Sequence, residues 1–230
     1  MNGAAKRDVD AVRYIVLRKL ASGLRHTLMG ELQSIQFLAE LGTRLLQNGA
    51  EQSKVSDCVG KIPLAASEAI ATGHSVIEWL RPEERATTTL DEAVGQCVRL
   101  AGDGWRMRAT VATVEMPGQA GEARVSKAAA RELVITALLA LTDENPGPLD
   151  IGVTAEPNGS SVQLRVDARV SGRVSPFRPS IVYHALTLAD VEQLAAQHNV
   201  ACTCEDGAVT FRFDLAKPEP EEAQRGTGAA

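Results

Sequence analysis

Residues 12–45 read VRYIVLRKLASGLRHTLMGELQSIQFLAELGTRL, and this stretch decides the fold of the N-terminal part of the 230-residue chain. Apolar residues recur three or four positions apart throughout it, which places them on one face of an α-helix. We predict a long amphipathic helix from about Asp8 to Gln47, with Asn48 and Gly49 as its C-terminal stop. Its buried stripe consists of Val12, Val16, Leu20, Leu24, Leu28, Leu32, Ile35, Leu38 and Leu45.

A second helical pattern begins after Ser53 and ends at Arg81 and Pro82. Two such helices joined by a short turn form a hairpin, and a hairpin by itself leaves most of its apolar stripe in water. A four-helix bundle made by two chains buries that stripe. We therefore predict that residues 8–81 form a dimerising helical hairpin and that the chain is a homodimer.

Short strands mixed with shorter helices are predicted over residues 86–216, and a Pro-, Glu- and Gly-rich tail, residues 217–230, should be disordered. The clearest element is a β-hairpin with an Asn158-Gly159 turn. The economical arrangement is an α+β two-layer sandwich with the helices on one face of a mixed sheet. The predicted strands are 85–90, 105–117, 149–157, 161–170 and a final hairpin at 200–216, and the predicted helices are 90–103, 127–141 capped by Ser126, and 181–198.

The composition narrows the class of protein. The formal net charge is −5 and no basic cluster is present, so nucleic acid is not expected as a direct partner. No apolar run approaches the roughly 20 residues that span a bilayer, and the N-terminus lacks the apolar core of a signal peptide, so we expect a cytoplasmic protein with no membrane partner. Cys202 and Cys204 share one face of a predicted strand, but a metal site would need two more ligands, so we expect reduced thiols and no metal.

His26 is the candidate functional residue of the first helix. At about 100° per residue it lies roughly 200° around the helix from Leu24 and therefore points away from the buried stripe. Its neighbours on that face are unusually small, although two glycines inside a helix cost about 1 kcal/mol each relative to alanine. A lone exposed histidine is more often a solvated polar residue, so the surrounding sequence has to decide its role. We assign the partner-binding surface to Ser22, Gly23, Met29 and Gly30.

The stretch LASGLRHTLMGELQSI, residues 20–35, resembles the phospho-acceptor box of the sensor histidine kinases. In that box a histidine is followed by an acidic residue, a leucine and, five positions on, usually a proline. His26 and Leu28 match this pattern, whereas Thr27 stands at the acidic position and Glu31 at the proline position. The missing carboxylate is the expected proton acceptor when the imidazole attacks ATP.

The resemblance covers about residues 10–216 and implies a dimerising hairpin followed by an ATPase-like domain. In RELVITALLAL, which is similar to the family's asparagine-bearing helix, Leu139 stands at the magnesium-binding position, and leucine cannot ligate a hard cation. Asp167 in RVDARVSG matches the adenine-binding aspartate, but Arg169 replaces the following glycine. Residues 183–188, YHALTL, replace a glycine-rich turn and leave no phosphate cradle. We expect no bound cofactor.

The resemblance is closest to the dimeric histidine phosphotransferases of the ChpT type, which look like histidine kinases stripped of ATP binding. It implies that His26 takes a phosphoryl group from the aspartyl phosphate of one receiver domain and passes it to another in a two-component phosphorelay. The partners would be receiver domains of a hybrid histidine kinase and of a response regulator, which supply the Mg. Two alternatives stay open: a non-catalytic dimeric adaptor that regulates a kinase or a response regulator, and an atypical active histidine kinase.

Overall fold

The computed structural model describes residues 8–80, 86–106, 110–145, 147–172 and 184–216. The chain divides into two compact units, one of residues Leu17–Glu83 and the other of Met1–Val16 with Glu84–Ala230. The first turns of the N-terminal helix therefore group with the second unit, whereas the sequence assigned the whole helix to the hairpin. The predicted tail, residues 217–230, lies outside the described residues.

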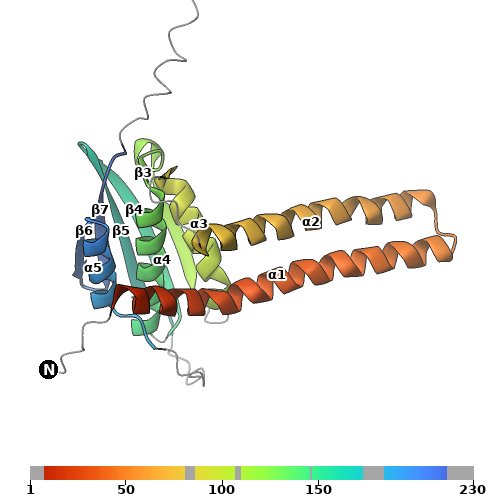
Figure 1. The fold of residues 1–230 in the computed structure, drawn as a ribbon, viewed down its shortest axis with the longest axis horizontal. Helices are drawn as coiled ribbons and strands as arrows, with labels where there is room; N and C mark the ends of the chain where they lie inside the picture. Colours follow the sequence, from red (N-terminus) through yellow and green to blue (C-terminus); the bar gives the residue numbers. More distant parts are fainter. Residues whose placement is uncertain (1–7, 81–85, 107–109, 146, 173–183, 217–230) are drawn as a thin grey trace, which may run out of the picture. The chain divides into compact units, whose positions relative to one another are not determined.

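Two long helices follow one another at the start of the chain. α1 spans Val9–Gln47 and α2 spans Gln52–Leu80 (Figure 1), which confirms both predicted helices. The predicted stop is also confirmed: Gly49 adopts a φ of +63°, and the amide of Ala50 donates to the carbonyl oxygen of Leu45 at 3.0 Å. This left-handed turn ends a helix at low cost because glycine has no Cβ.

Contacts along the seam between α1 and α2 hold the hairpin together. The Thr72 hydroxyl donates to the Glu31 carboxylate at 2.9 Å, and the Cys58 thiol donates to the carbonyl oxygen of Leu38 at 3.3 Å. Gly42 is buried, and a Cβ at this position would lie 3.4 Å from the Val59 side chain. The glycine therefore lets the two helices approach closely near the tip.

One residue of the predicted stripe, Leu32, is exposed in the protomer. Leu32 is 47% exposed, whereas Leu20 is buried and Leu28 and Ile35 are half-buried. Leu32 lies about 120° around α1 from Leu20, so it falls at the edge of the seam. The apolar stripe is wider than α2 alone can cover, and burial of Leu32 by a second hairpin stays a prediction.

The second unit contains a five-stranded mixed sheet in the order β2-β4-β5-β7-β6. β2 pairs in parallel with β4, and all other neighbours in this sheet are antiparallel. β1 and β3 form a separate antiparallel pair. The strands are β1 Thr87–Thr89, β2 Val111–Glu115, β3 Arg124–Ser126, β4 Leu149–Asn158, β5 Ser161–Val170, β6 Ala201–Glu205 and β7 Ala208–Asp214.

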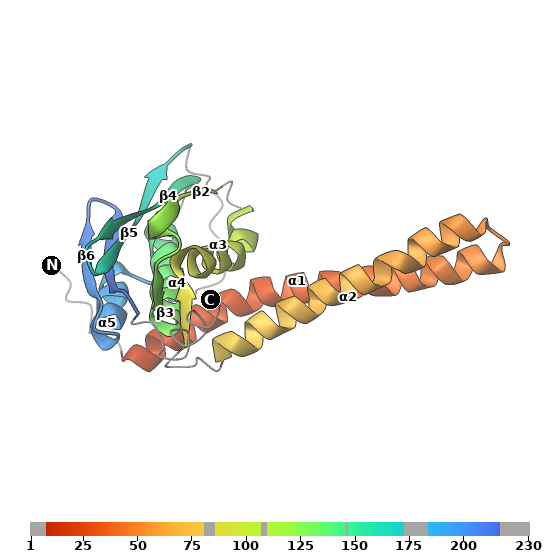
Figure 2. The ribbon, with the colours of Figure 1, turned by 90° about the horizontal axis from the view of Figure 1, so that it is seen from above.

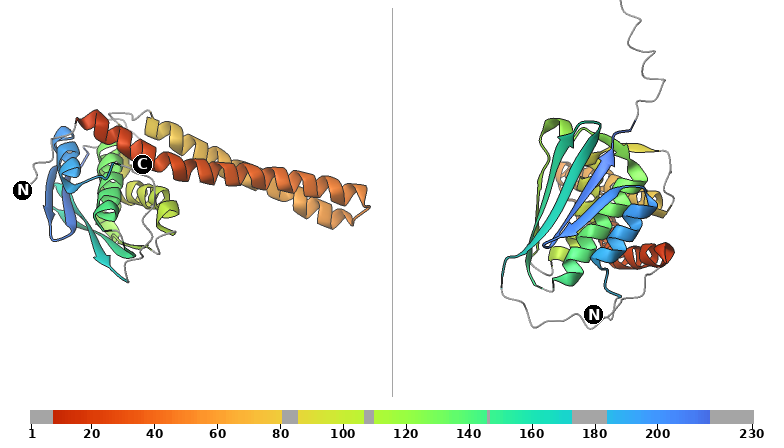
Figure 3. Two further views of the ribbon diagram at one scale, coloured as in Figure 1. Left: turned by 90° about the horizontal axis from the view of Figure 1, so that it is seen from below. Right: turned by 90° about the vertical axis from the view of Figure 1, so that its left-hand side faces the viewer.

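Helices α3 (Leu90–Arg106), α4 (Lys127–Glu144) and α5 (Leu188–Gln197) lie on one side of the five-stranded sheet, and a 3-10 turn, η1, spans Gly118–Ala120 (Figures 2 and 3). Alternate residues of the central strands face these helices and are at most 2% exposed. This arrangement confirms the predicted α+β fold with helices on one face of a mixed sheet. The strand residues of the core are Ile151, Val153, Val162, Leu164, Val166, Val209, Phe211 and Phe213.

β3 and η1 were not predicted, and two element boundaries differ from the prediction for a visible reason. α3 continues through Trp105, where a strand was predicted, because the buried indole donates from Nε1 to the Thr142 hydroxyl on α4 at 3.2 Å. α5 begins at Leu188 because Thr187 and Asp190 form a capping box, in which the side chain of each accepts from the backbone amide of the other. Residues 181–183 of the predicted helix lie outside the described part of the chain.

Candidate functional site

His26 lies on α1 within the hairpin unit and is exposed. Gly30, one turn further, is exposed too, and a Cβ built there would meet no atom within 4 Å. Met29 is exposed and Gly23 is half-buried. Ser22 lies in α1, but its side chain falls outside the described atoms. The imidazole therefore stands on an accessible face with open space beside it.

An exposed aromatic residue, Phe37, lies on the same face of α1 and was not assigned to the site from the sequence. It is 64% exposed and stands 11 residues, about three turns, beyond His26. Eleven residues bring the helix back to within about 20° of the same direction. The spacing of 11 residues between His26 and Phe37 could have identified Phe37 from the sequence. An aromatic residue on the polar side of a helix does not pack into the protomer's own core.

Glu31 does not act as a carboxylate beside His26. One of its oxygens accepts the hydrogen bond from Thr72 on α2, and the other is buried without a hydrogen-bond partner among the described residues. The side chain is therefore turned into the hairpin seam. Thr27 occupies the position next to His26 at which the kinase pattern has its acid. No other carboxylate occurs on α1 between residues 11 and 39.

The segment before α5 is fixed to the C-terminal end of α4. The amide of Leu186 donates to the Asp143 carboxylate at 2.8 Å, and the amide of Leu188 donates to the Glu144 carboxylate at 3.2 Å. Leu186 is fully buried. This is the segment that the sequence resemblance aligned with the glycine-rich turn of histidine kinases, and the amides of Leu186 and Leu188 are bonded to carboxylates of α4. Leu139, on the same helix, is half-buried and offers no oxygen.

Asp167 lies in β5 on the sheet face opposite the helices, since its neighbour Val166 points into the core. Its carboxylate lies 3.9 Å from the Arg165 guanidinium and 3.7 Å from that of Arg169. Its oxygens also cover Gly152 on β4, where a Cβ would approach to 3.1 Å. Two exposed guanidinium groups are therefore the nearest cations to this carboxylate, and its match to an adenine-binding aspartate stays a prediction.

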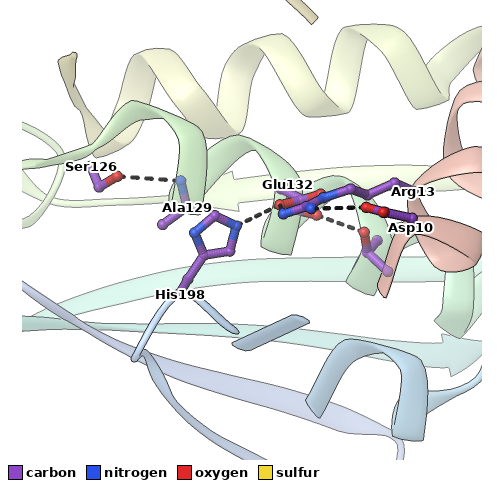
Figure 4. Close-up of polar contacts among 7 residues, drawn as sticks. Asp10, Arg13, Ser126, Ala129, Glu132 and His198 are labelled. Atoms are coloured by element: carbon purple, nitrogen blue, oxygen red, sulfur yellow. Dashed lines mark hydrogen bonds and ion pairs between the residues drawn. The ribbon is translucent and has the colours of Figure 1, made fainter. Parts of the chain in front are cut away.

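A charged cluster joins three elements of the second unit (Figure 4). Arg13 on α1 donates to Glu132 on α4 through Nε at 2.6 Å and Nη2 at 3.1 Å, and the His198 ring at the end of α5 bonds the same carboxylate. Burial by itself would raise the pKa of Glu132, but the hydrogen bonds from His198 and Arg13 outweigh it and hold that pKa below its ordinary value. Figure 4 also shows the predicted cap of α4, in which Ser126 Oγ accepts from the amide of Ala129 at 3.4 Å.

Glu132→Gln should lower the free energy of unfolding by about 2–4 kcal/mol near neutral pH, because it removes the charge that two partners share. The lowered pKa means that the carboxylate contributes stability above its ordinary pKa of 4.5 and loses that contribution as the pH falls through the lowered value. The stabilities of the natural and variant proteins should therefore converge in acid. Denaturant unfolding at a series of pH values measures both effects.

Asp10→Asn is the matched control for this change. Asp10 pairs with the same guanidinium at 3.3 Å, but its side chain is 83% exposed, so we expect a loss below about 0.5 kcal/mol. If Glu132→Gln costs no more than Asp10→Asn, the cluster does not stabilise the unit.

The remaining histidines differ in their surroundings. His74 and His184 are exposed, whereas His198 belongs to the charged cluster. No group of three or more side chains suited to metal binding lies together in the part of the chain that the structure describes. None of the described helices is both long enough and apolar enough to cross a membrane.

Comparison with known proteins finds similarity in structure alone. No family model and no curated protein matches the chain. Similar solved structures include the catalytic domain of the histidine kinase ThkA, with 18% identity over 58% of this chain and 98% of that chain and a TM-score of 0.42. A complex of ThkA with the response regulator TrrA has 15% identity over 90% of this chain and 63% of that chain, with a TM-score of 0.41. A bacterial phosphotransferase has 17% identity over 93% of this chain and 98% of that chain, with a TM-score of 0.39. Likenesses this distant carry no argument about chemistry, which rests on the residues described above.

Proposed function

We propose that this chain is a dimeric histidine phosphotransfer protein of the ChpT type, in which His26 relays a phosphoryl group between the aspartates of two receiver domains. The resemblance of residues 20–35 to a phospho-acceptor box supports the assignment. The observation that carries it is the open surface around the imidazole, where Gly30 leaves space for a partner to reach the ring. Phe37, on the same face, adds an apolar contact for that partner.

The reaction needs little from this chain beyond an accessible, uncharged imidazole. A ring nitrogen of His26 attacks the phosphorus of the aspartyl phosphate, the P–N bond forms, and the P–O bond breaks with the electron pair leaving on the carboxylate. The reverse of this step loads the second receiver. The Mg ion that offsets phosphoryl charge belongs to the receiver's own acidic pocket. Glu31, turned into the seam, takes no part in it.

A partly exposed apolar stripe supports a homodimer. Val59, Ile70 and Ile77 fall on one line along α2 at about 100° per residue, and they are 46–60% exposed. Leu32 adds exposed apolar surface on α1. A second hairpin packed here would cover these residues in a four-helix bundle. His26 lies about 120° around α1 from Leu32, so dimerisation would leave it accessible.

The α/β unit then acts as a docking surface and dimer support without nucleotide chemistry. Two observations support this part of the proposal. The segment around Leu186 is bonded to α4 and buried, and Leu139 stands at the position of the expected metal ligand. The chain itself would need no cofactor.

Mg-ATP should not bind at physiological concentration, because no oxygen ligand stands at position 139 and the backbone amides of Leu186 and Leu188 are already bonded to Asp143 and Glu144. Isothermal calorimetry of the full chain measures this, with a histidine kinase catalytic domain as the positive control. Saturable, Mg-dependent binding with a dissociation constant below about 1 mM, roughly 4 kcal/mol, would instead favour the atypical kinase.

Gly30→Leu should slow phosphotransfer by at least about tenfold, a barrier increase of about 1.4 kcal/mol, because its side chain would fill the space beside His26. It should also stabilise the helix by up to about 1 kcal/mol, since leucine is the better helix former. Gly60→Leu on α2 is the matched control: it is exposed and equally open, and it should stabilise without slowing transfer. Equal transfer rates in the two variants would place the reacting surface elsewhere.

The direct test of the proposal is incubation with a receiver domain carrying a radiolabelled aspartyl phosphate. Label that moves to this chain and is lost in acid, as a phosphoramidate bond predicts, supports phosphotransfer. The alternative adaptor would bind the receiver through the same exposed surface, Met29 and Phe37 included, and would take no label. Sustained receiver binding with no transfer would favour the adaptor.

A further inference from the structure

Two thiols lie side by side at the edge of the five-stranded sheet. Cys202 and Cys204 belong to β6, the last strand in the sheet order, and their sulfur atoms are 3.9 Å apart. They pair in register with Phe211 and Val209, which are fully buried, so both thiols lie on the helix side of the sheet. The Cys204 sulfur lies 4.0 Å from the carbonyl oxygen of Leu188, the first residue of α5. Both cysteines are only half-buried, so solvent reaches this corner.

The strand keeps these thiols from closing into a disulfide. Residues two apart in a strand have Cα atoms about 6.6 Å apart and side chains nearly parallel, whereas a disulfide needs Cβ atoms about 3.8 Å apart. Closing the bond would force β6 to buckle away from β7, with which residues 201–205 pair along their whole length. The reduced dithiol is therefore the form that the sheet favours.

A single soft metal ion fits the same gap without any movement of the strand. The sulfur atoms, 3.9 Å apart, lie within reach of one ion bonded to both, and rotation of the half-buried side chains opens the sulfur–metal–sulfur angle toward the near-linear arrangement that two-coordinate Cu(I) prefers. Thiolates select soft cations such as Cu(I) over hard ones. Zn(II) usually takes four protein ligands in a structural site, and no group of three or more candidate ligands occurs among the described residues, so the two-thiol set favours Cu(I).

We propose that Cys202 and Cys204 form a bidentate site for one thiophilic cation of the Cu(I) class. Binding releases the two thiol protons and leaves an anionic bis-thiolate complex, with no change of oxidation state. The site belongs to the α/β unit, and it is independent of the phosphotransfer proposed for His26.

Cu(I) presented by a chromogenic chelator to the reduced full chain, without oxygen, is the test. We expect one ion to be taken up per chain, and either Cys202→Ser or Cys204→Ser to weaken uptake by at least about 100-fold, since chelation needs both sulfurs. Circular dichroism checks that each variant is folded. In the natural chain, bound Cu(I) should also slow alkylation of both cysteines, as mapped by peptide mass spectrometry.

The other two cysteines supply the control. Cys58 and Cys97 are buried in separate units, and burial raises the pKa of Cys97 to about 12, so neither should compete for the ion. The double variant Cys58→Ala, Cys97→Ala should retain full uptake. The proposal is overturned if the natural chain takes up no Cu(I), if single serine variants at 202 and 204 bind as tightly as the natural chain, or if the control variant loses uptake.

Discussion

His26→Gln should abolish acceptance of phosphate from a phosphorylated receiver, with the transfer rate falling by at least about 1,000-fold, or about 4 kcal/mol in barrier. The amide of glutamine has no nucleophilic nitrogen, so no P–N bond can form in place of the phosphohistidine. An exposed side chain contributes little to stability, so the melting temperature and the oligomeric state should stay unchanged. Quenched-flow transfer from labelled receiver, followed by gel autoradiography, measures the rate.

His74→Gln is the matched control, because His74 is also exposed and lies on the neighbouring helix of the hairpin. It should transfer at the natural rate. Label on the His26→Gln protein, or no label on the natural protein with any receiver from the same genome, would remove the phosphotransfer assignment. The adaptor would then become the better description.

Ile70→Lys should convert the dimer into a folded monomer, raising the dimer dissociation constant by at least about 100-fold, or about 2.8 kcal/mol. In a two-fold dimer each substitution appears twice, so two ammonium groups would be placed in an apolar seam. In the protomer Ile70 is 60% exposed, so its own fold loses little. Sedimentation velocity across a concentration series gives the dissociation constant.

Leu64→Lys tests whether the effect is specific to one side of α2. Leu64 is 67% exposed and lies about 120° around the helix from Ile70, away from the proposed seam. It should remain dimeric at concentrations at which Ile70→Lys is monomeric. A natural protein that sediments as a monomer at micromolar concentration would contradict the four-helix bundle.

The parts of the fold that the sequence predicted are those governed by local chemistry. Three such features are confirmed: the helical spacing of the apolar residues, the stop at Gly49 and the cap at Ser126. Each depends only on residues that lie within one or two helical turns of one another. The hairpin turn at Gly159 is equally local, with a φ of +61°. The capping box of Thr187 and Asp190 is local too, but the predicted helix already extended across it.

The parts that could not be predicted depend on which surfaces meet. Arg13, Glu132 and His198 are separated by 119 and 66 residues, so their convergence requires the packing of three helices to be known. The exposure of Leu32 depends in the same way on how much of α1 is covered by α2. For the candidate site, the exposed position of His26 followed from helix geometry, and the same geometry places Phe37 on that face about three turns further along α1.

The backbone amides of Leu186 and Leu188 are hydrogen-bonded to Asp143 and Glu144. These bonds would obstruct any attempt to engineer nucleotide binding into this chain. Leu139→Asn alone would place an oxygen at the position that the resemblance assigns to a metal ligand, yet it would leave Leu186 buried in place. An incoming triphosphate would have to displace that segment and then lie beside two carboxylates stripped of their donors, where like charges repel. A synthetic kinase built on this scaffold therefore requires a replacement loop, designed together with its anion-binding amides, before any single restored side chain can have an effect.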